Sequence, residues 1–193
     1  MEEKARTKVT EEDKVFDEAK VIALAIKGDR RAFGLLVKKY QRQVLRTVMG
    51  MLGDRDAAMD IVQDSFIKAY QALDRFEPGR PFYPWLSRIA TNLAINYIKR
   101  QGRQTSLDNE VIERASSDPG PLEKLENMET GRRFQAALQE LPEVYRVAFV
   151  LRTFEDMSYD EIANKLGISP GTVDSRLYRA RRILMDKLKD LIQ

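Results

Sequence analysis

Residues 158–182 read SYDEIANKLGISPGTVDSRLYRARR, and this stretch decides the fold. Ser158 and Glu161 have the spacing of a capping box, in which each side chain satisfies a free backbone N–H at the start of a helix. Gly167 suits the end of that helix, because glycine adopts the left-handed conformation without steric cost. Ser169 then caps a second helix, whose first residue is a proline that loses nothing there by lacking an N–H. The stretch therefore predicts two helices joined by a tight turn.

The second of these helices should have one apolar face and one polar face. Apolar side chains recur along it at helical spacing: Val173, Leu177, Ala180, Leu184, Leu188 and Leu191. The residues that face outward near its start are Asp174, Ser175, Tyr178, Arg179 and Arg182. Side chains in that position of a helix-turn-helix contact base edges in the major groove of DNA. An ordinary helix pair with a solvated basic face is the alternative, but four arginines against one aspartate in residues 170–182 favour DNA.

Composition limits the functions that are possible. The net charge of +3 and the pI near 9.0 suit a nucleic-acid partner without requiring one. The sequence has no cysteine and no histidine, which excludes disulfides, thiolate chemistry, the usual zinc sites and histidine general bases. We therefore expect a protein that is not an enzyme and has no cofactor or metal. Because the sequence has neither an apolar run of the length of a membrane span nor a signal-peptide core, we expect it to be cytoplasmic, without membrane insertion.

The predicted fold is all-α, with two small helical domains and an acidic linker. A chain of 193 residues with 43% hydrophobic content fits two compact domains of about 80 residues each. We place the first domain at residues 20–103 and the second, which contains the helix-turn-helix, at residues 122–193. Residues 104–121 are acidic and too polar to fold alone, and residues 1–19 form an N-terminal tail or a helix extension.

Four helices are expected in the first domain. Hydrophobic spacing and capping residues predict a short helix at 21–26 that stops at Gly28, a core helix from Asp29 to Gly53, a third that opens at Asp54 or Asp56, and a fourth that begins near Pro84. Two prolines and a glycine interrupt residues 74–81 and leave an exposed or half-exposed loop with two aromatic residues nearby. In the second domain, helical spacing resumes at Leu122, and Pro142 begins another helix.

Two polar helix faces in the first domain are candidates for binding. The outer face of the third helix carries Asp60, Gln63, Asp64 and Lys68. Such a face is most often simply solvated and less often a docking surface. The polar face of the fourth helix carries Arg88, Asn92, Asn96 and Lys99. Basic and amide side chains near aromatic residues are typical of single-stranded DNA binding, although a core tryptophan under a basic helix explains Trp85 at least as well.

Three segments together resemble a known family. They read DIVQDSFIKAY (residues 60–70), FYPWLSRIATN (residues 82–92) and GTVDSRLYRAR (residues 171–181). In this order, and separated by an acidic linker, they are similar to the extracytoplasmic-function (ECF) class of bacterial RNA polymerase sigma factors. The resemblance covers about residues 20 to 190, and the pattern is closest to the envelope-stress members of enteric bacteria.

The resemblance implies a promoter-specificity factor with three kinds of binding residue. The first domain would bind the clamp helices of core RNA polymerase through Asp60, Gln63, Asp64 and Lys68. It would capture the non-template strand of the promoter's minus-10 element with Ala72, Phe76, Arg88, Asn92, Asn96 and Lys99. The second domain would meet the polymerase flap and bind the minus-35 element with Thr172, Asp174, Ser175, Arg176, Tyr178, Arg179 and Arg182. An anti-sigma factor is a further expected partner, and the linker would pass toward the RNA exit path.

This sequence departs from the family pattern at three of its positions. Asp174 stands where members usually carry a basic residue, which removes a phosphate or base contact and leaves the minus-35 sequence undetermined. Pro84 and Ser87 replace residues that are often larger or aromatic in relatives, so we expect strand stacking near the minus-10 element to differ.

Two other functions fit part of the sequence. A free-standing helix-turn-helix regulator would explain residues 158–182 but not the segments of the first domain, and such a regulator normally dimerises to read two half-sites. A serine recombinase would place a helix-turn-helix after a catalytic domain, but that domain needs strands, and the first hundred residues here predict helices throughout. Binding to core polymerase distinguishes the three functions.

Overall fold

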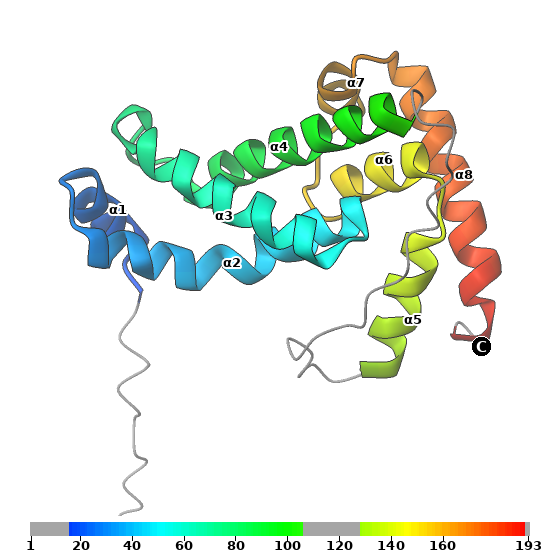
Figure 1. Ribbon diagram of the computed structural model, residues 1–193, viewed down its shortest axis with the longest axis horizontal. Helices are drawn as coiled ribbons and strands as arrows, with labels where there is room; N and C mark the ends of the chain where they lie inside the picture. The colour runs from blue at the N-terminus through cyan, green and yellow to red at the C-terminus, as the bar shows by residue number, and fades with distance from the viewer. Residues whose placement is uncertain (1–15, 106–127, 192–193) are drawn as a thin grey trace, which may run out of the picture.

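The computed structural model describes residues 16–105 and 128–191, and within them all regular structure is helical (Figure 1). The helices are α1 (Glu18–Ile26), α2 (Arg30–Leu52), α3 (Arg55–Gln71), α4 (Phe82–Thr105), α5 (Met128–Gln139), α6 (Glu143–Thr153), α7 (Tyr159–Leu166) and α8 (Pro170–Leu188), with short 3-10 turns at Leu73–Arg75 and Lys189–Leu191. The all-α prediction is confirmed. Most of the predicted tail and linker, the helical spacing predicted at 122–127 and the side chain of Leu191 lie outside the described residues.

In the first half of the structure (α1–α4), capping residues determine where α1, α2 and α3 begin. The Asp29 carboxylate accepts hydrogen bonds from the backbone N–H groups of Arg31 (2.8 Å) and Ala32 (3.2 Å), so α2 begins where the sequence predicts. Of the two predicted openings of α3, the structure uses Asp54 as the cap. Helix α1 begins earlier than predicted, because Asp17 caps it.

The core of the first half lies where α2, α3 and α4 pack together. Its largest fully buried side chains include Leu36, Val48, Met51, Phe82 and Leu86, each 0% exposed. Each such side chain contributes about 1.5–3 kcal/mol through removal from water. These contacts fix the orientation of α3 and α4, whose outer faces carry the candidate binding residues.

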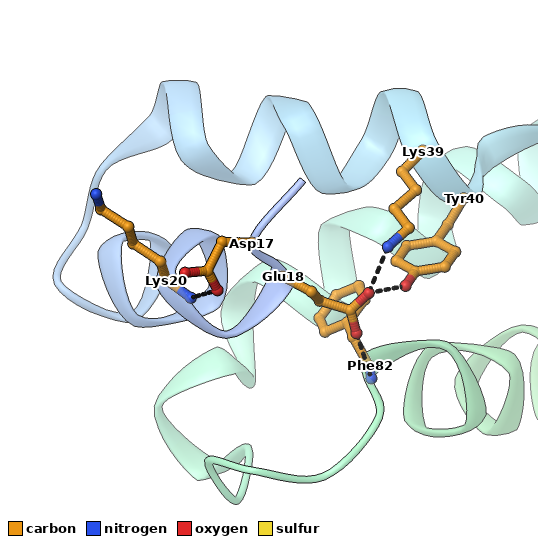
Figure 2. A network of polar contacts seen from close by, with 6 residues as sticks. All are labelled: Asp17, Glu18, Lys20, Lys39, Tyr40 and Phe82. Carbon is orange, nitrogen blue, oxygen red and sulfur yellow. Dashed lines mark hydrogen bonds and ion pairs between the residues drawn. The ribbon is translucent and has the colours of Figure 1, made fainter. Parts of the chain in front are cut away.

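A polar network joins α1 to the start of α4 (Figure 2). The Glu18 carboxylate accepts hydrogen bonds from Lys39 Nζ (2.6 Å), from the hydroxyl of Tyr40 and from the backbone N–H of Phe82 (3.2 Å). Burial raises the pKa of Glu18, but the hydrogen bonds from Lys39, Tyr40 and Phe82 outweigh it and hold this pKa below its ordinary value. One carboxylate therefore connects three helices of the first half.

The second half (α5–α8) contains the predicted helix-turn-helix as α7 and α8. Ser158 and Glu161 form the capping box, and Gly167 ends α7 in the left-handed conformation with φ of 70°. Ser169 caps α8, and Pro170 is its first residue. The predicted local structure of this motif is confirmed in each of these details.

The two halves are in contact (Figure 1). The C-terminal part of α2 packs against α6 and the end of α5, and the buried residues of both halves form one continuous hydrophobic cluster. The side chain of Arg146 on α6 donates to the carbonyl of Met51 on α2 (3.1 Å) and to the carbonyls of Gln139 (2.9 Å) and Leu141 (3.2 Å). The sequence did not predict this contact.

Candidate nucleic-acid and polymerase interfaces

The outward face of α8 presents most of the candidate minus-35 residues to solvent. Asp174, Ser175, Tyr178, Arg179 and Arg182 are exposed, and Thr172 and Arg176 are half-buried. On the opposite face, Val173, Leu177 and Ala180 are fully buried against the neighbouring helices. Because its apolar face is fixed in the core, α8 holds its polar face in one orientation.

Arg179 has a partner within the second half. Its guanidinium donates a hydrogen bond to the hydroxyl of Tyr145 on α6 (2.9 Å) and lies 5.9 Å from the centre of that ring. The contact restricts the rotamers of a long side chain, which would reduce the entropy cost of binding a ligand through it. Tyr178, one residue earlier, is 64% exposed and is free to contact a base or a sugar.

The polar face of α4 carries four of the candidate minus-10 residues in one row. Arg88, Asn92, Asn96 and Lys99 are all exposed, and their spacing places them on one side of the helix. The backbone beneath the row is held by Thr91, whose hydroxyl donates to the carbonyl of Ser87 (2.8 Å). The structure thus brings these four residues together as predicted.

The remaining two candidate minus-10 residues are less accessible. Ala72 is half-buried at the end of α3, and Phe76 is only 4% exposed. The Phe76 ring packs edge-on against Phe82 (5.7 Å between centres) and Trp85 (5.1 Å). The loop at residues 77–81 is exposed, as predicted, whereas Phe76 and Phe82 on either side of it are buried because their rings pack edge-on against each other. Phe76 remains a candidate as an inner wall of a base pocket.

The outer face of α3 lies beside an apolar groove. Asp60, Gln63, Asp64 and Lys68 are all exposed. Between α2 and α3 runs a groove of about 760 Å³, and Asp60 and Gln63 are among its lining residues. The groove also contains Met59 and Ile67, which are 50% and 46% exposed. Exposed apolar side chains with a polar rim are typical of protein docking sites.

The α4 face also meets the second half. Lys165 on α7 donates a hydrogen bond from Nζ to Oδ1 of Asn92 (2.7 Å). Burial lowers the pKa of Lys165, and the neighbouring charge of Arg88 lowers it further. The amide predicted to read a DNA base is thus engaged by the helix-turn-helix.

The part of the chain that the structure describes has neither a metal-binding cluster nor a membrane-spanning helix. There, no group of three or more histidine, cysteine, aspartate or glutamate side chains could hold a metal ion. Of the helices described, none combines the length and the apolarity that crossing a bilayer requires.

Comparison with known families and proteins identifies the chain. The Sigma-70 region 2 family matches residues 36–104, and the Sigma-70 region 4 family matches residues 131–184. The ECF RNA polymerase sigma-E factor of Salmonella typhimurium is 40% identical over an alignment of 176 residues, and the match covers 86% of this chain and 92% of that protein. The chain belongs to the ECF class of RNA polymerase sigma factors. The sigma-E factor of Escherichia coli K12 and the RNA polymerase sigma-H factor of Pseudomonas aeruginosa are each 39% identical over the same length.

Two solved structures share this fold. CnrH in complex with the cytosolic domain of CnrY is 29% identical, with a TM-score of 0.55 over 90% of this chain and 97% of that chain. RpoE from Bartonella quintana in complex with the anti-sigma factor NepR is 28% identical, with a TM-score of 0.60 over 81% of this chain and 96% of that chain. As a sigma factor, this chain serves promoter-specific transcription initiation, so neither the free-standing regulator nor the recombinase accounts for it.

Several residues that line the α2–α3 groove or contact the candidate binding residues were not predicted from the sequence. Met59 and Ile67 were not predicted as binding residues. Both are apolar and lie outside the inner stripe of α3, so an apolar residue on the outer face was a signal that the sequence offered. The roles of Tyr145 and Lys165 could not be predicted from spacing along one helix, because they contact Arg179 and Asn92, which lie 34 and 73 residues away in the sequence.

Proposed function

We propose that this sigma factor docks on the clamp helices of core RNA polymerase through the groove between α2 and α3. The observation that carries the proposal is the apolar groove of about 760 Å³ with the exposed Asp60 and Gln63 on its wall. An amphipathic helix laid in such a groove would cover Met59 and Ile67, and the polar groups beside it would fix its register. Asp64 and Lys68 extend this polar side along α3.

The DNA-binding roles follow from the faces of α4 and α8. The α4 row holds basic groups at both ends and amides between them, which suits a single strand whose phosphates meet Arg88 and Lys99 while Asn92 reads a flipped base. The α8 face holds Tyr178 and Arg179 about two and a half turns from a capped helix start, which suits base edges in the major groove of the minus-35 element. Contact of the second half with the polymerase flap rests on the family resemblance.

An anti-sigma factor is the regulatory partner that we propose. Two sigma factors of this fold have been solved with a partner bound, CnrH with the cytosolic domain of CnrY and RpoE with the anti-sigma factor NepR. A partner of that kind would compete with the polymerase or with DNA for the faces described above.

Polymerase affinity of a double variant tests the docking proposal. Gln63→Ala combined with Asp64→Ala removes two exposed polar side chains, so the melting temperature should stay nearly unchanged. Affinity for core polymerase should fall at least about tenfold, roughly 1.4 kcal/mol, because truncating polar anchors in a desolvated interface is costly. Asp186→Ala, exposed on α8, is the control and should leave the affinity unchanged. Equal affinity of the double variant and the control would remove α3 from the interface.

A further inference from the structure

Helix α4 begins at Phe82 without a capping side chain from its own stretch of the chain. The residue before it is Pro81, whose side chain has no hydrogen-bond acceptor. Phe82 is 0% exposed, so water does not reach its backbone N–H. A buried N–H group without a partner costs free energy, so the start of α4 needs an acceptor from another part of the fold.

Glu18 supplies that acceptor from 64 positions earlier in the sequence (Figure 2). Its Oε1 accepts the hydrogen bond from the Phe82 N–H (3.2 Å). Its Oε2 accepts from Lys39 Nζ (2.6 Å) and from the hydroxyl of Tyr40, so two side chains of α2 fix the direction in which the carboxylate points. The negative charge also lies at the N-terminal, positive end of the α4 dipole, where it is stabilising. Glu18 thus caps α4 across the tertiary structure.

The turn that Glu18 caps carries two of the aromatic rings that support Phe76, the candidate inner wall of the base pocket. Phe82 packs against Tyr40 (5.7 Å between ring centres) and Trp85 (5.5 Å). Phe76 packs edge-on against both Phe82 (5.7 Å) and Trp85 (5.1 Å). Tyr40 contributes twice, because its hydroxyl binds Glu18 and its ring contacts Phe82. Phe76 therefore rests on rings whose backbone Glu18 holds.

We propose that Glu18 is a positioning residue for capture of the minus-10 strand, because it holds the first turn of α4 and the Phe76 wall in the arrangement that receives a flipped base. It acts through the backbone of Phe82 and needs no contact with DNA. The inference rests on the proposed role of α4 and Phe76 in strand capture. Without Glu18, the rings would have to be ordered when the base arrives, and that ordering would take part of the binding free energy that offsets base flipping.

Fluorine NMR of Trp85 tests the positioning without DNA. Trp85 is the only tryptophan of the chain, so 5-fluorotryptophan labels one site in the full-length protein. The unaltered chain should give one sharp resonance, and Glu18→Ala should shift or split it. An unchanged resonance in Glu18→Ala would overturn the proposal.

Asp29→Ala is the matched control for lost stability. It removes the cap of α2 and so destabilises the same half, but the hydrogen bonds that it removes lie within α2. Its Trp85 resonance should match that of the unaltered chain. All variants are compared at a temperature at which far-UV circular dichroism shows them fully folded.

Promoter opening measures the consequence for function. Holoenzyme is assembled on a linear promoter that the unaltered holoenzyme selects from a random pool, and permanganate reactivity gives the ratio of open to closed complexes. Glu18→Ala should lower this ratio at least about fivefold, because two rings lose their fixed arrangement. Its affinity for core polymerase and for a minus-35 duplex should stay unchanged. A variant that was merely less stable, such as Asp29→Ala, would be normal in all three assays once folded.

Two substitutions of similar length separate the hydrogen bond from the size of the side chain. Glu18→Gln keeps an oxygen that can accept from the Phe82 N–H, and it should restore the ratio of open to closed complexes to within about twofold of the unaltered protein. Glu18→Met offers only a weakly accepting sulfur, so it should open the promoter as poorly as Glu18→Ala. Equal opening by Glu18→Gln and Glu18→Met would overturn the proposal.

Asn92→Ala distinguishes this inference from the proposed function. Poor opening by Asn92→Ala together with normal opening by Glu18→Ala would overturn the positioning role and leave the proposed function standing. Normal opening by Asn92→Ala would contradict the proposed function of α4, and the positioning role would fall with it.

Discussion

Removing the Glu18 carboxylate should destabilise the first half by about 2–4 kcal/mol, because hydrogen bonds to a charged group contribute about 1.5–3 kcal/mol and a buried hydroxyl left unpaired costs about 1–3 kcal/mol. Most of this loss comes from Tyr40, which is 8% exposed and would lose its acceptor, and from the backbone N–H of Phe82 at the start of α4. The ion pair with Lys39 adds little, since side chains that are 39% and 26% exposed are partly screened by solvent.

Urea denaturation of Glu18→Ala, followed by tryptophan fluorescence, measures this loss. Trp85 is the only tryptophan of the chain and packs in the aromatic cluster of the first half, so it reports on the relevant unfolding. The midpoint should fall with little change in slope. Glu77→Ala removes a carboxylate whose pair with Arg80 is exposed, and it should cost no more than about 0.5 kcal/mol. Equal losses in the two variants would refute the assigned role of Glu18.

The same variant should show a defined pH dependence. Burial raises the pKa of Glu18, but the hydrogen bonds together lower it by more than burial raises it, so the pKa of Glu18 in the folded protein lies below the unfolded value. A group of this kind contributes stability above the unfolded pKa, near 4.5, and loses that contribution as the pH falls through the folded pKa. The difference in unfolding free energy between the unaltered protein and Glu18→Ala should therefore be constant near neutral pH and shrink below about pH 4.5.

Two further predictions concern DNA. Arg179→Ala should weaken specific binding to the minus-35 element by about 1–3 kcal/mol in a gel-shift titration, and Tyr145→Phe should cause part of that loss, because it frees the Arg179 guanidinium. Arg181→Ala is the control. An equal loss of affinity for all DNA sequences in Arg179→Ala would make Arg179 a phosphate contact. In permanganate footprinting, Asn92→Ala should leave a linear promoter closed but act normally on a pre-melted promoter. Flipping a base out of the duplex costs a few kcal/mol, which contacts in the base pocket must offset. Normal opening of the linear promoter by this variant would contradict the assignment.

The parts of this structure that the sequence predicts are those whose chemistry is local. Asp29, Ser158 and Gly167 act within four residues of their own position, so caps and helix ends could be read directly from spacing. The outward faces of α4 and α8 follow in the same way from the apolar stripes on their opposite sides.

The parts that the sequence did not predict depend on residues far apart in the chain. Thr47 and Glu155 are 108 positions apart, and nothing in the pattern around either residue identifies the other. The groove beside α3 exists only once α2 is packed against it. The burial of Phe76 has a more local cause, since Phe82 and Trp85, six and nine positions later, are brought back onto it by the loop between them.

The contact between the halves gives a physical reason for a departure noted in the sequence. The resemblance predicts a larger residue at position 87 than the serine present, and in this structure Ser87 is 6% exposed and its hydroxyl donates to Glu155. A bulky side chain at this position would fill the space that the Glu155 carboxylate occupies, so the small side chain of Ser87 and the glycine at position 50 both permit the contact between the halves. In the proposed function, α4 would make two kinds of contact, one with Glu155 and Lys165 of the second half and one with the minus-10 strand. A substitution on α4 would then alter both contacts, and its consequence for transcription would depend on which contact it weakens more.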